Sequence, residues 1–521
     1  MTLLAGLVAL GLAGLASRRW PEVPLGWPLS VLLAGLPWLA ALAGRPSAPQ
    51  EARWLPWLPP TWLEAWGLTA RWDALHWAAL WIGVTLWLVV LLAEAPSVQS
   101  SSPGLAGWAL GWGLVTVSLW SGLPQTPGGL WWAWALTDVA ALLLALYVWP
   151  DGETRLRWLW HTTARSLSWG AALLWSVNAG AASLDQALDL PGARAGLLAV
   201  VLWRFLWSGP TWSGAARQAF WRRTGRLLLT WLFLGSTLPA LFALARWPGD
   251  LTPWPASLVF WGLAFVGVWV GLARWLGSTS FEEGFPGLVT VWGWMAVVAA
   301  WYGRPETALF WGGLPWFLGT AVVLFRLPEV RLAPVWALLA LTFTFWPFTP
   351  GRAGLDLWTA VPGWVGLWSG VVLVLSLLGG LPLPALRGRG LDAQPRWVQV
   401  FYPAGMAVLT LGLWRWGLTL PAAPAPTLGG VLTWVTGPLI LLATGVAGWY
   451  LWRHQATLES WSRALTRPLR FFLGLAAALY RGTVQAVENG LYFLSLVFEG
   501  EAGLMWAMAF LAAIALFLMG R

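Results

Sequence analysis

The sequence of 521 residues contains no cysteine and no lysine, and only three histidines. Without cysteine, the chain has no disulfide, iron–sulfur cluster or thiolate zinc site. The histidines lie far apart in the sequence, which argues against a histidine-rich metal or haem site. All 30 basic residues are arginine, which keeps its proton at any biological pH, so the chain lacks an amine that exchanges protons as lysine does. We expect no metal and no cofactor.

Charged residues are also scarce, at 10% of the chain, whereas hydrophobic residues make up 58%. Apolar runs of about 20 residues recur along the sequence, and runs of this length predict transmembrane helices. Their unbroken character excludes the alternating pattern of a membrane barrel. The expected fold class is therefore all-α, a polytopic transmembrane helical bundle of about 14–16 spans with a cytoplasmic amphipathic helix before the last span.

The apolar runs also predict how the chain is organised. The predicted spans are 2–17, 25–43, 73–95, 104–122, 129–149, 157–180, 195–209, 227–246, 256–275, 285–302, 306–325, 332–349, 357–381, 398–420, 428–452 and 502–520. We divide the chain into a helical bundle over 1–452, an amphipathic lateral helix over 453–485 and a C-terminal transmembrane helix within 486–521. Segment 44–72 is rich in Trp and Pro, which is typical of a segment at the membrane interface.

The arginines predict the orientation in the membrane. If the N-terminus lies outside, 19 arginines fall in cytoplasmic loops and 8 on the opposite side. This bias follows the positive-inside rule. The net charge of +9 alone is also typical of nucleic-acid-binding proteins, but here the arginines lie in loops between apolar runs. We therefore predict a multi-pass protein of the inner (cytoplasmic) membrane with its N-terminus outside, and no nucleic-acid partner. Lipids are expected partners.

Asp138 lies near the middle of the predicted span 129–149. A charged carboxylate at bilayer depth costs at least about 2.5–3.5 kcal/mol on insertion scales. Two interpretations stay open. Asp138 is either a proton-binding carboxylate that faces the bundle interior, or a structural acid held by Thr137 or by a neighbouring arginine.

Other polar residues fall in or near the spans. Arg165 and Arg204 are each able to pair with Asp138 across helices, or else to extend toward the interface as snorkelling side chains. Asp73 opens the third predicted span, one turn before His76, near the outer interface. His76 and His161 are each either satisfied bundle histidines or proton carriers.

Several of these residues stand in local patterns that follow one another along residues 70–420. The patterns are Arg71-Trp72-Asp73-Ala74-Leu75-His76, Thr137-Asp138, Thr163-Ala164-Arg165-Ser166-Leu167, Arg204 before Pro210, and Thr290-Val291-Trp292-Gly293-Trp294-Met295. Their order resembles the antiporter-like membrane subunits of respiratory complex I (the NADH-quinone oxidoreductase) and of multisubunit Na⁺/H⁺ antiporters. In that family the corresponding patterns are Asp-x-Leu-Ser, Trp-Glu, Thr-Arg-x-Gly-Asp, a lysine before a proline, and Ser-x-x-Gly-x-Met.

The chain also departs from this family. Pro315 and Gly319 stand where the family has His-x-x-x-Lys. Where the family has Gly-Phe-x-x-Lys-Asp/Glu, this chain has Gly351-Arg352-Ala353-Gly354-Leu355-Asp356. Every lysine of the family's polar axis is missing. The resemblance therefore implies a degenerate subunit that keeps the scaffold and the lateral helix, with at most a reduced proton path. Candidates for that path are Asp138, Arg165, Arg204, Asp73, His76, His161 and Asp356.

The resemblance implies an integral membrane subunit of a complex I-related assembly that translocates protons or cations. Such a subunit packs against other membrane subunits and has no catalytic centre of its own.

Two alternatives remain. One is a stand-alone secondary transporter, which would contain inverted repeats and a midplane cavity. The other is a membrane-embedded lipid or sugar transferase, although the loop acids Asp151 with Glu153 and Glu282 with Glu283 are typical of solvated turns.

Overall fold

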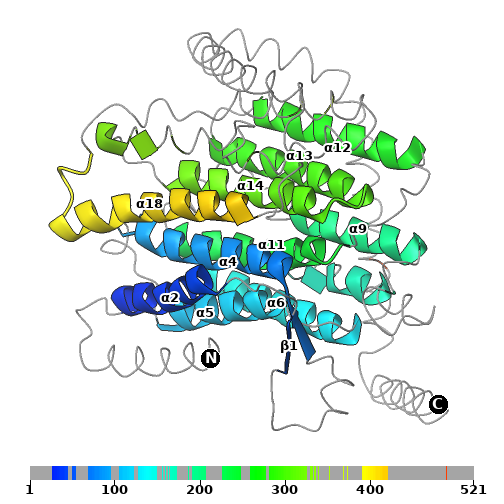
Figure 1. The fold of residues 1–521 in the computed structure, drawn as a ribbon, viewed down its shortest axis with the longest axis horizontal. Coiled ribbons are helices and arrows are strands. Elements are labelled where there is room, and N and C mark those ends of the chain that lie inside the picture. Colours follow the sequence, from blue (N-terminus) through cyan, green and yellow to red (C-terminus); the bar gives the residue numbers. More distant parts are fainter. Residues whose placement is uncertain are drawn as a thin grey trace. The chain divides into compact units, whose positions relative to one another are not determined.

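A computed structural model shows how these segments fold. It describes residues 26–44, 50–53, 69–95, 105–122, 127–149, 162–163, 165–172, 191–206, 226–247, 258–276, 281–324, 329–332, 334–335 and 390–419, and single residues at 155, 159, 186, 338, 351, 368, 372 and 489. The chain divides into two compact units, Met1–Gln455 and Ala456–Arg521. Nearly all of the described residues belong to the first unit, which is a bundle of helices (Figure 1).

The observed helices begin and end within a few residues of the predicted spans. They are α2 (Gly26–Ala43), α4 (Ala74–Ala93), α5 (Leu105–Trp120), α6 (Pro127–Val148), α9 (Pro191–Leu206), α11 (Arg226–Ala245), α12 (Leu258–Leu276), α13 (Phe281–Trp301), α14 (Pro305–Leu324) and α18 (Arg396–Thr419), with a short 3₁₀ helix, η1 (Val330–Leu332). The predicted helical bundle is confirmed. The expected count of 14–16 spans includes 2–17, 357–381, 428–452 and 502–520, which lie outside the described residues or contain only isolated ones.

The composition of the described helices confirms a membrane protein. Three of them are long and apolar enough to cross a bilayer, over Ala74–Ala93, Gly129–Val148 and Arg396–Gly417. Shorter apolar helical stretches cover Trp27–Ala43, Ala106–Trp120, Phe260–Leu276 and Gly287–Trp301. Backbone hydrogen bonds inside a helix satisfy the polar groups that lipid does not hydrate, which is why apolar runs of this length fold as helices.

Helix α4 is the central helix of the described bundle. It packs against α2, α11, α14 and α18, and its side chains are buried along almost its whole length. Tryptophan N–H groups fix its neighbours, because Trp77 Nε1 donates to the Ala41 carbonyl of α2 at 2.9 Å and Trp81 Nε1 donates to the Gly412 carbonyl of α18 at 2.8 Å. At the other end of α4, Trp27 Nε1 of α2 donates to the Leu91 carbonyl at 2.8 Å.

Small residues bring α12 and α13 into close contact. A Cβ on Gly271 would lie 2.8 Å from the Gly287 carbonyl oxygen, and a Cβ on Gly287 would lie 2.6 Å from the Gly271 carbonyl oxygen. Neither position has room for a side chain. Close backbone approach of this kind is typical of helix pairs in membranes, where dispersion forces take the place of the hydrophobic effect.

One feature departs from the all-helical expectation. The predicted interfacial segment 44–72 contains two short strands, β1 (Gln50–Arg53) and β2 (Thr69–Trp72). They pair antiparallel with Gln50 opposite Trp72 and Arg53 opposite Thr69. Pairing of the two strands satisfies backbone groups that a Pro-rich segment does not satisfy as a helix. Because β2 runs into Asp73, the hairpin lies at the end of the bundle where α4 begins.

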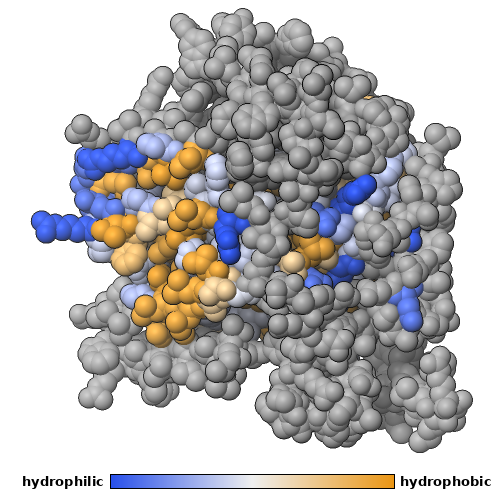
Figure 2. Space-filling model, in the orientation of Figure 1, coloured by the Kyte–Doolittle hydropathy of each residue, from blue (hydrophilic) through white to orange (hydrophobic). Residues whose placement is uncertain are grey.

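The outer helices expose apolar side chains. On α2 the exposed positions Leu32, Leu36 and Leu39 repeat at helical spacing, and on α18 Val400 and Leu411 are exposed. Figure 2 shows apolar residues gathered on this face where α2 and α18 lie. In a soluble protein such a face would promote aggregation. In a membrane protein it is the expected surface toward lipid or toward a neighbouring membrane subunit.

Candidate functional site

Helix α6 carries Asp138 into the interior of the bundle. The positions Trp134, Asp138 and Ala141 repeat every three to four residues and are buried, whereas Leu136 and Val139 point outward. Only 1% of the Asp138 residue surface is exposed. The helical period of α6 therefore decides that the carboxylate faces its neighbours and not the outer surface.

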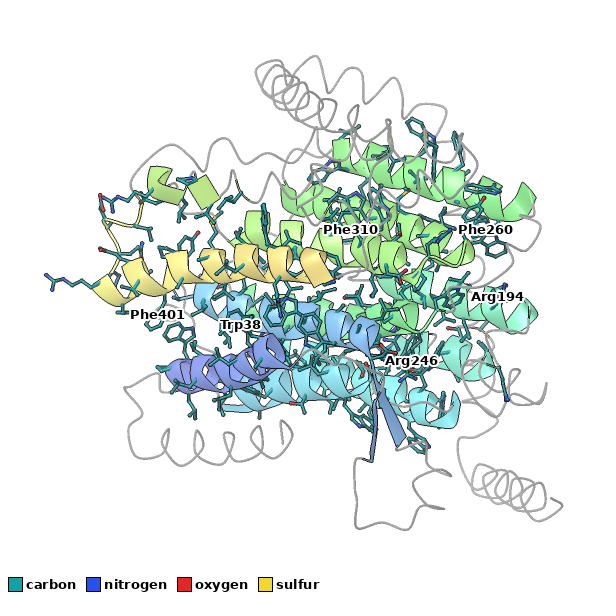
Figure 3. The ribbon with its side chains drawn as sticks, in the orientation of Figure 1. Trp38, Arg194, Arg246, Phe260, Phe310 and Phe401 are labelled. Carbon is teal, nitrogen blue, oxygen red and sulfur yellow. The ribbon has the colours of Figure 1, made fainter. Side chains whose placement is uncertain are left out.

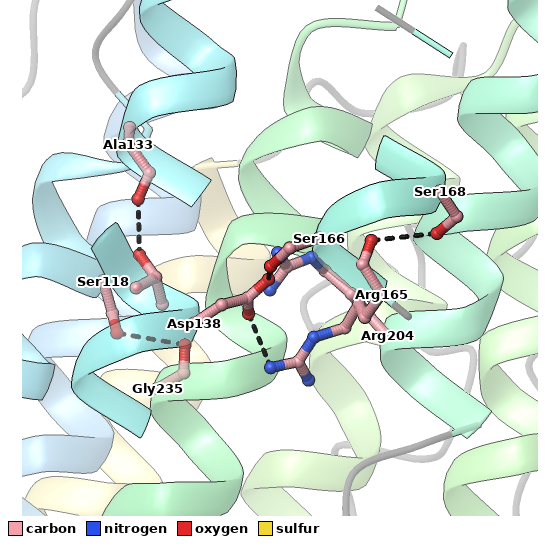
Figure 4. Close-up of polar contacts among 9 residues, drawn as sticks. Ser118, Ala133, Asp138, Arg165, Ser166, Ser168, Arg204 and Gly235 are labelled. Atoms are coloured by element: carbon pink, nitrogen blue, oxygen red, sulfur yellow. Dashed lines mark hydrogen bonds and ion pairs between the residues drawn. The ribbon is translucent and has the colours of Figure 1, made fainter. Parts of the chain in front are cut away.

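Three side chains hydrogen-bond to the carboxylate of Asp138 (Figure 4). Arg165 Nη2 donates to Oδ1 at 2.5 Å, and Arg204 Nη2 of α9 donates to Oδ2 at 3.0 Å. Ser166 Oγ donates to Oδ2 at 2.6 Å. Both carboxylate oxygens are thus held by charged or hydroxyl donors, and charge-assisted hydrogen bonds of this kind are about twice as strong as neutral ones.

Two tryptophans cover the arginine side of this site. The Cζ atom of Arg204 lies 4.2 Å from the ring centroid of Trp134, in cation–π geometry. Trp134 stacks on Trp169, with ring centroids 3.7 Å apart and an interplanar angle of 14°. Trp169 follows Arg165 by one turn, so the segment that supplies one guanidinium group also supplies the indole that stacks on Trp134. We call Asp138, Arg165, Arg204 and Ser166 the Asp138 cluster.

The three charged side chains of the Asp138 cluster are buried. Arg204 has no exposed surface and Arg165 has 2%. Taking charges out of water costs several kcal/mol per ion, and their mutual attraction offsets this cost only when the geometry is good and further hydrogen bonds are made. Here one carboxylate lies between two guanidinium groups. The loss of the negative charge would leave two buried positive charges close together.

The structure resolves several alternatives that the sequence left open. Both arginines pair with Asp138, so the snorkelling interpretation of Arg165 and Arg204 is wrong. Thr137 does not hold the carboxylate, because its Oγ1 donates to the Ala133 carbonyl at 2.8 Å within α6. Ser166 and Trp134 were not among the predicted site residues, although Trp134 lies one helical turn before Asp138 and that spacing indicates a shared face.

The predicted residues Asp73 and His76 lie together at the end of the bundle where α4 begins and where α5 and α11 end. His76 contacts the Asp73 carboxylate and also Arg246, which follows α11. Figure 3 labels Arg246 at this end of the molecule. Arg246 was not among the predicted site residues, because nothing in its local sequence distinguishes it from other loop arginines.

Two predicted candidates, His161 and Asp356, lie outside the described residues. Within the part of the chain that the structure describes, no group of three or more His, Asp or Glu side chains is arranged to hold a metal ion. The described site residues thus form two separate polar groups, one inside the bundle and one at its end.

Comparisons with known proteins place the fold. No known family description and no curated protein sequence matches the chain. Among solved structures, it is similar to a chain of the Mrp complex from Dietzia sp. DQ12-45-1b, with a TM-score of 0.57 and 16% identity over 99% of this chain. The protein spans 63% of the length of that Mrp chain.

A second similar structure is the membrane-bound sulfane sulfur reductase, an archaeal respiratory membrane complex. The TM-score is 0.57 and the identity 15%, over 100% of this chain and 99% of the matched chain. At these identities the similarity shows the fold alone. The protein therefore has the helical fold of a membrane chain found in Mrp and in a respiratory membrane complex, built around a buried, doubly paired aspartate.

Proposed function

We propose that this protein is an antiporter-like membrane subunit of a multisubunit assembly that translocates protons or cations. Two independent observations support the proposal. The fold matches chains of two multisubunit membrane complexes over essentially the whole length of this chain. The order of local patterns from Asp73 to Met295 resembles the antiporter-like subunits of such assemblies.

Within that assembly, we propose that the Asp138 cluster holds helices together and does not carry protons. The observation that carries this proposal is the contact of both arginines with one buried carboxylate, at 2.5 and 3.0 Å. A carboxylate that relays protons must pass through its neutral form. In this cluster that form would leave Arg165 and Arg204 facing each other without the charge between them.

The absence of lysine supports the same proposal. In the resembling family, lysines relay protons by exchanging charged and neutral forms. Here Arg204 is the base nearest to the place of one such lysine, and a guanidinium group does not give up its proton under biological conditions. The subunit thus keeps the scaffold with a structural ion pair at the centre of its polar axis, and any remaining translocation path uses other groups.

Purification from native membranes tests the assembly. The expected result is co-purification with other membrane subunits in a stable complex that survives mild detergent. A protein that is extracted from the membrane without other subunits and stays monomeric would contradict the proposal and favour a stand-alone transporter.

Removal of the three charged side chains of the Asp138 cluster tests its role. We expect the triple variant Asp138→Leu, Arg165→Met and Arg204→Met to fold and assemble, because apolar residues of similar volume often replace a buried ion pair at little cost. We also expect the assembly that contains it to retain proton or cation transport. A folded, assembled triple variant without transport would show that the cluster carries protons, and the structural role would then be wrong.

A further inference from the structure

The polar group at the start of α4 is built around Asp73. This residue is the N-cap of α4, and its Oδ1 accepts hydrogen bonds from the backbone N–H groups of Leu75 at 3.0 Å and His76 at 2.9 Å. The same oxygen lies 2.7 Å from Nδ1 of His76. Capping therefore fixes the position of the carboxylate, and the carboxylate in turn fixes the imidazole ring.

Arg246 approaches the other side of the ring. Its Nε donates to Nε2 of His76 at 2.7 Å, and its Nη2 donates to the Gly122 carbonyl at 3.0 Å. A guanidinium group has donors only, so Nε2 of His76 must be an acceptor. A neutral imidazole has one donor and one acceptor nitrogen. Nδ1 therefore carries the proton and donates it to Asp73, and His76 is neutral in this arrangement.

We propose that Asp73, His76 and Arg246 form a proton-binding site at this end of the bundle. One proton from the solvent binds Nε2 of His76, an Nε2–H bond forms, and the hydrogen bond from Arg246 Nε is broken. The positive charge on the ring then lies beside the carboxylate of Asp73, and Arg246 withdraws from the ring. No other atom is transferred, and the co-reactant is hydronium from the aqueous phase.

Burial and exposure suit such a site. The His76 side chain is 3% exposed, whereas the Asp73 side chain is 20% exposed, so the carboxylate lies between the buried ring and the surface of the protein. Arg246 is half-buried. Because Arg246 also holds the Gly122 carbonyl just after α5, protonation of His76 loosens the contact between the ends of α5, α11 and the start of α4.

Other charged groups at this end belong to the hairpin and to the helices packed against α4. Glu51 and Arg53 lie on β1, and Arg71 lies on β2, which runs into Asp73. Arg304 and Glu306 lie at the start of α14, and Arg415 lies in the last turns of α18, where it is exposed. The Asp138 cluster is built from other residues, on other helices, than the site at the start of α4. The proposed proton-binding site therefore goes beyond the proposed structural role of the Asp138 cluster. An experiment that contradicts one of the two proposals does not contradict the other.

The chain itself offers a sharp test, because it contains only three histidines, His76, His161 and His454. The full-length protein, with ¹⁵N only in its histidine rings, is studied by NMR in lipid nanodiscs from neutral to mildly acidic pH. His76→Gln identifies the His76 signals by subtraction, and His161→Gln serves as the matched control for the labelling. Ring nitrogen shifts report which nitrogen carries a proton.

At neutral pH we expect a single Nδ1–H tautomer for His76, which is the less common tautomer of free histidine. On acidification we expect Nε2 of His76 to gain a proton while the helical circular dichroism is unchanged. In Arg246→Met, the Nε2–H tautomer should gain population, because the hydrogen bond that Arg246 Nε donates to Nε2 is lost. An Nε2–H tautomer at neutral pH, or a His76 ring that takes up no proton before the helices unfold, would overturn the proposal.

Discussion

The Asp138 cluster and the Asp73–His76–Arg246 group both place a carboxylate next to an arginine, yet they differ in what lies between the charges. In the Asp138 cluster the guanidinium groups contact the carboxylate directly, and all three charged side chains are buried. At the start of α4 a neutral imidazole lies between Asp73 and Arg246, within reach of the surface. Permanent charges in contact make a rigid contact between helices, whereas an intervening titratable ring makes an arrangement that responds to protons.

The largest expected effect comes from Asp138→Asn, which removes the negative charge and keeps the shape. Two buried guanidinium groups then lose their counter-ion, and breaking a buried pair in this way costs about 3–5 kcal/mol. Thermal unfolding in detergent, followed by circular dichroism, measures the loss. The matched control is Asp392→Asn, because Asp392 pairs with Arg331 at 3.1 Å in an exposed ion pair.

An exposed pair contributes about 0–1 kcal/mol, so the control should unfold close to the wild-type temperature. Equal shifts for both aspartates would show that burial does not set the strength of the Asp138 cluster. The contrast with the site at the start of α4 would then lose its physical basis.

A smaller effect is expected for Arg204→Lys, which keeps the charge but not the planar group. The guanidinium group lies 4.2 Å from the Trp134 ring centroid and also donates to Asp138, and an ammonium group does not reproduce both contacts in the same position. We expect a loss of about 2 kcal/mol, the value of a desolvated cation–π contact. Thermal unfolding measures it, with Arg415→Lys on the exposed side of α18 as the control.

If Arg204→Lys were as stable as the wild type, charge alone would explain the role of Arg204. The stacked pair of Trp134 and Trp169 would then be ordinary packing of the bundle.

Much of the fold was predictable because it depends on local properties of the sequence. The apolar run from Asp73 to Ala95 predicts α4 almost to the residue, since a lipid-embedded backbone has few alternatives to a helix. The strand pairing of residues 50–53 with 69–72 was not predictable, because Trp and Pro indicate an interfacial position without fixing a backbone conformation.

The candidate site was predictable in part for the same reason. A carboxylate inside an apolar helix identifies Asp138, and basic residues in later spans identify Arg165 and Arg204 as possible partners. Sequence alone does not decide that both arginines reach the same carboxylate, because that depends on how α6, α9 and the segment with Arg165 are arranged in the bundle. Arg246 shows the limit more clearly, since it lies 170 residues after His76 and contacts it only because α4 and α11 are neighbours.

Another variant tests the hydroxyl donor of the Asp138 cluster, Ser166. Ser166→Ala removes the 2.6 Å hydrogen bond to Oδ2 and leaves both arginines in place. We expect a loss of about 1.5 kcal/mol, which is the lower range for hydrogen bonds to a charged group. Ser168→Ala is the control, because Ser168 Oγ donates only to the Arg165 carbonyl, at 2.8 Å. A larger loss in the control than in Ser166→Ala would contradict the assignment of Ser166 to the cluster.

The smallest effect is expected for Arg246→Gln, and its dependence on salt distinguishes the two polar groups. Gln removes the charge of a half-buried side chain that donates to His76 and to the Gly122 carbonyl, so we expect a loss of about 0.5–1 kcal/mol at low ionic strength. Salt screens charges near the surface much more than buried pairs. The difference between wild type and Arg246→Gln should therefore shrink as salt is added, whereas the difference for Asp138→Asn should persist. If both differences shrank equally, Asp138 would have to be accessible to ions from the solvent. A carboxylate with that access meets a requirement of a proton carrier, and this result would argue against a purely structural role for Asp138.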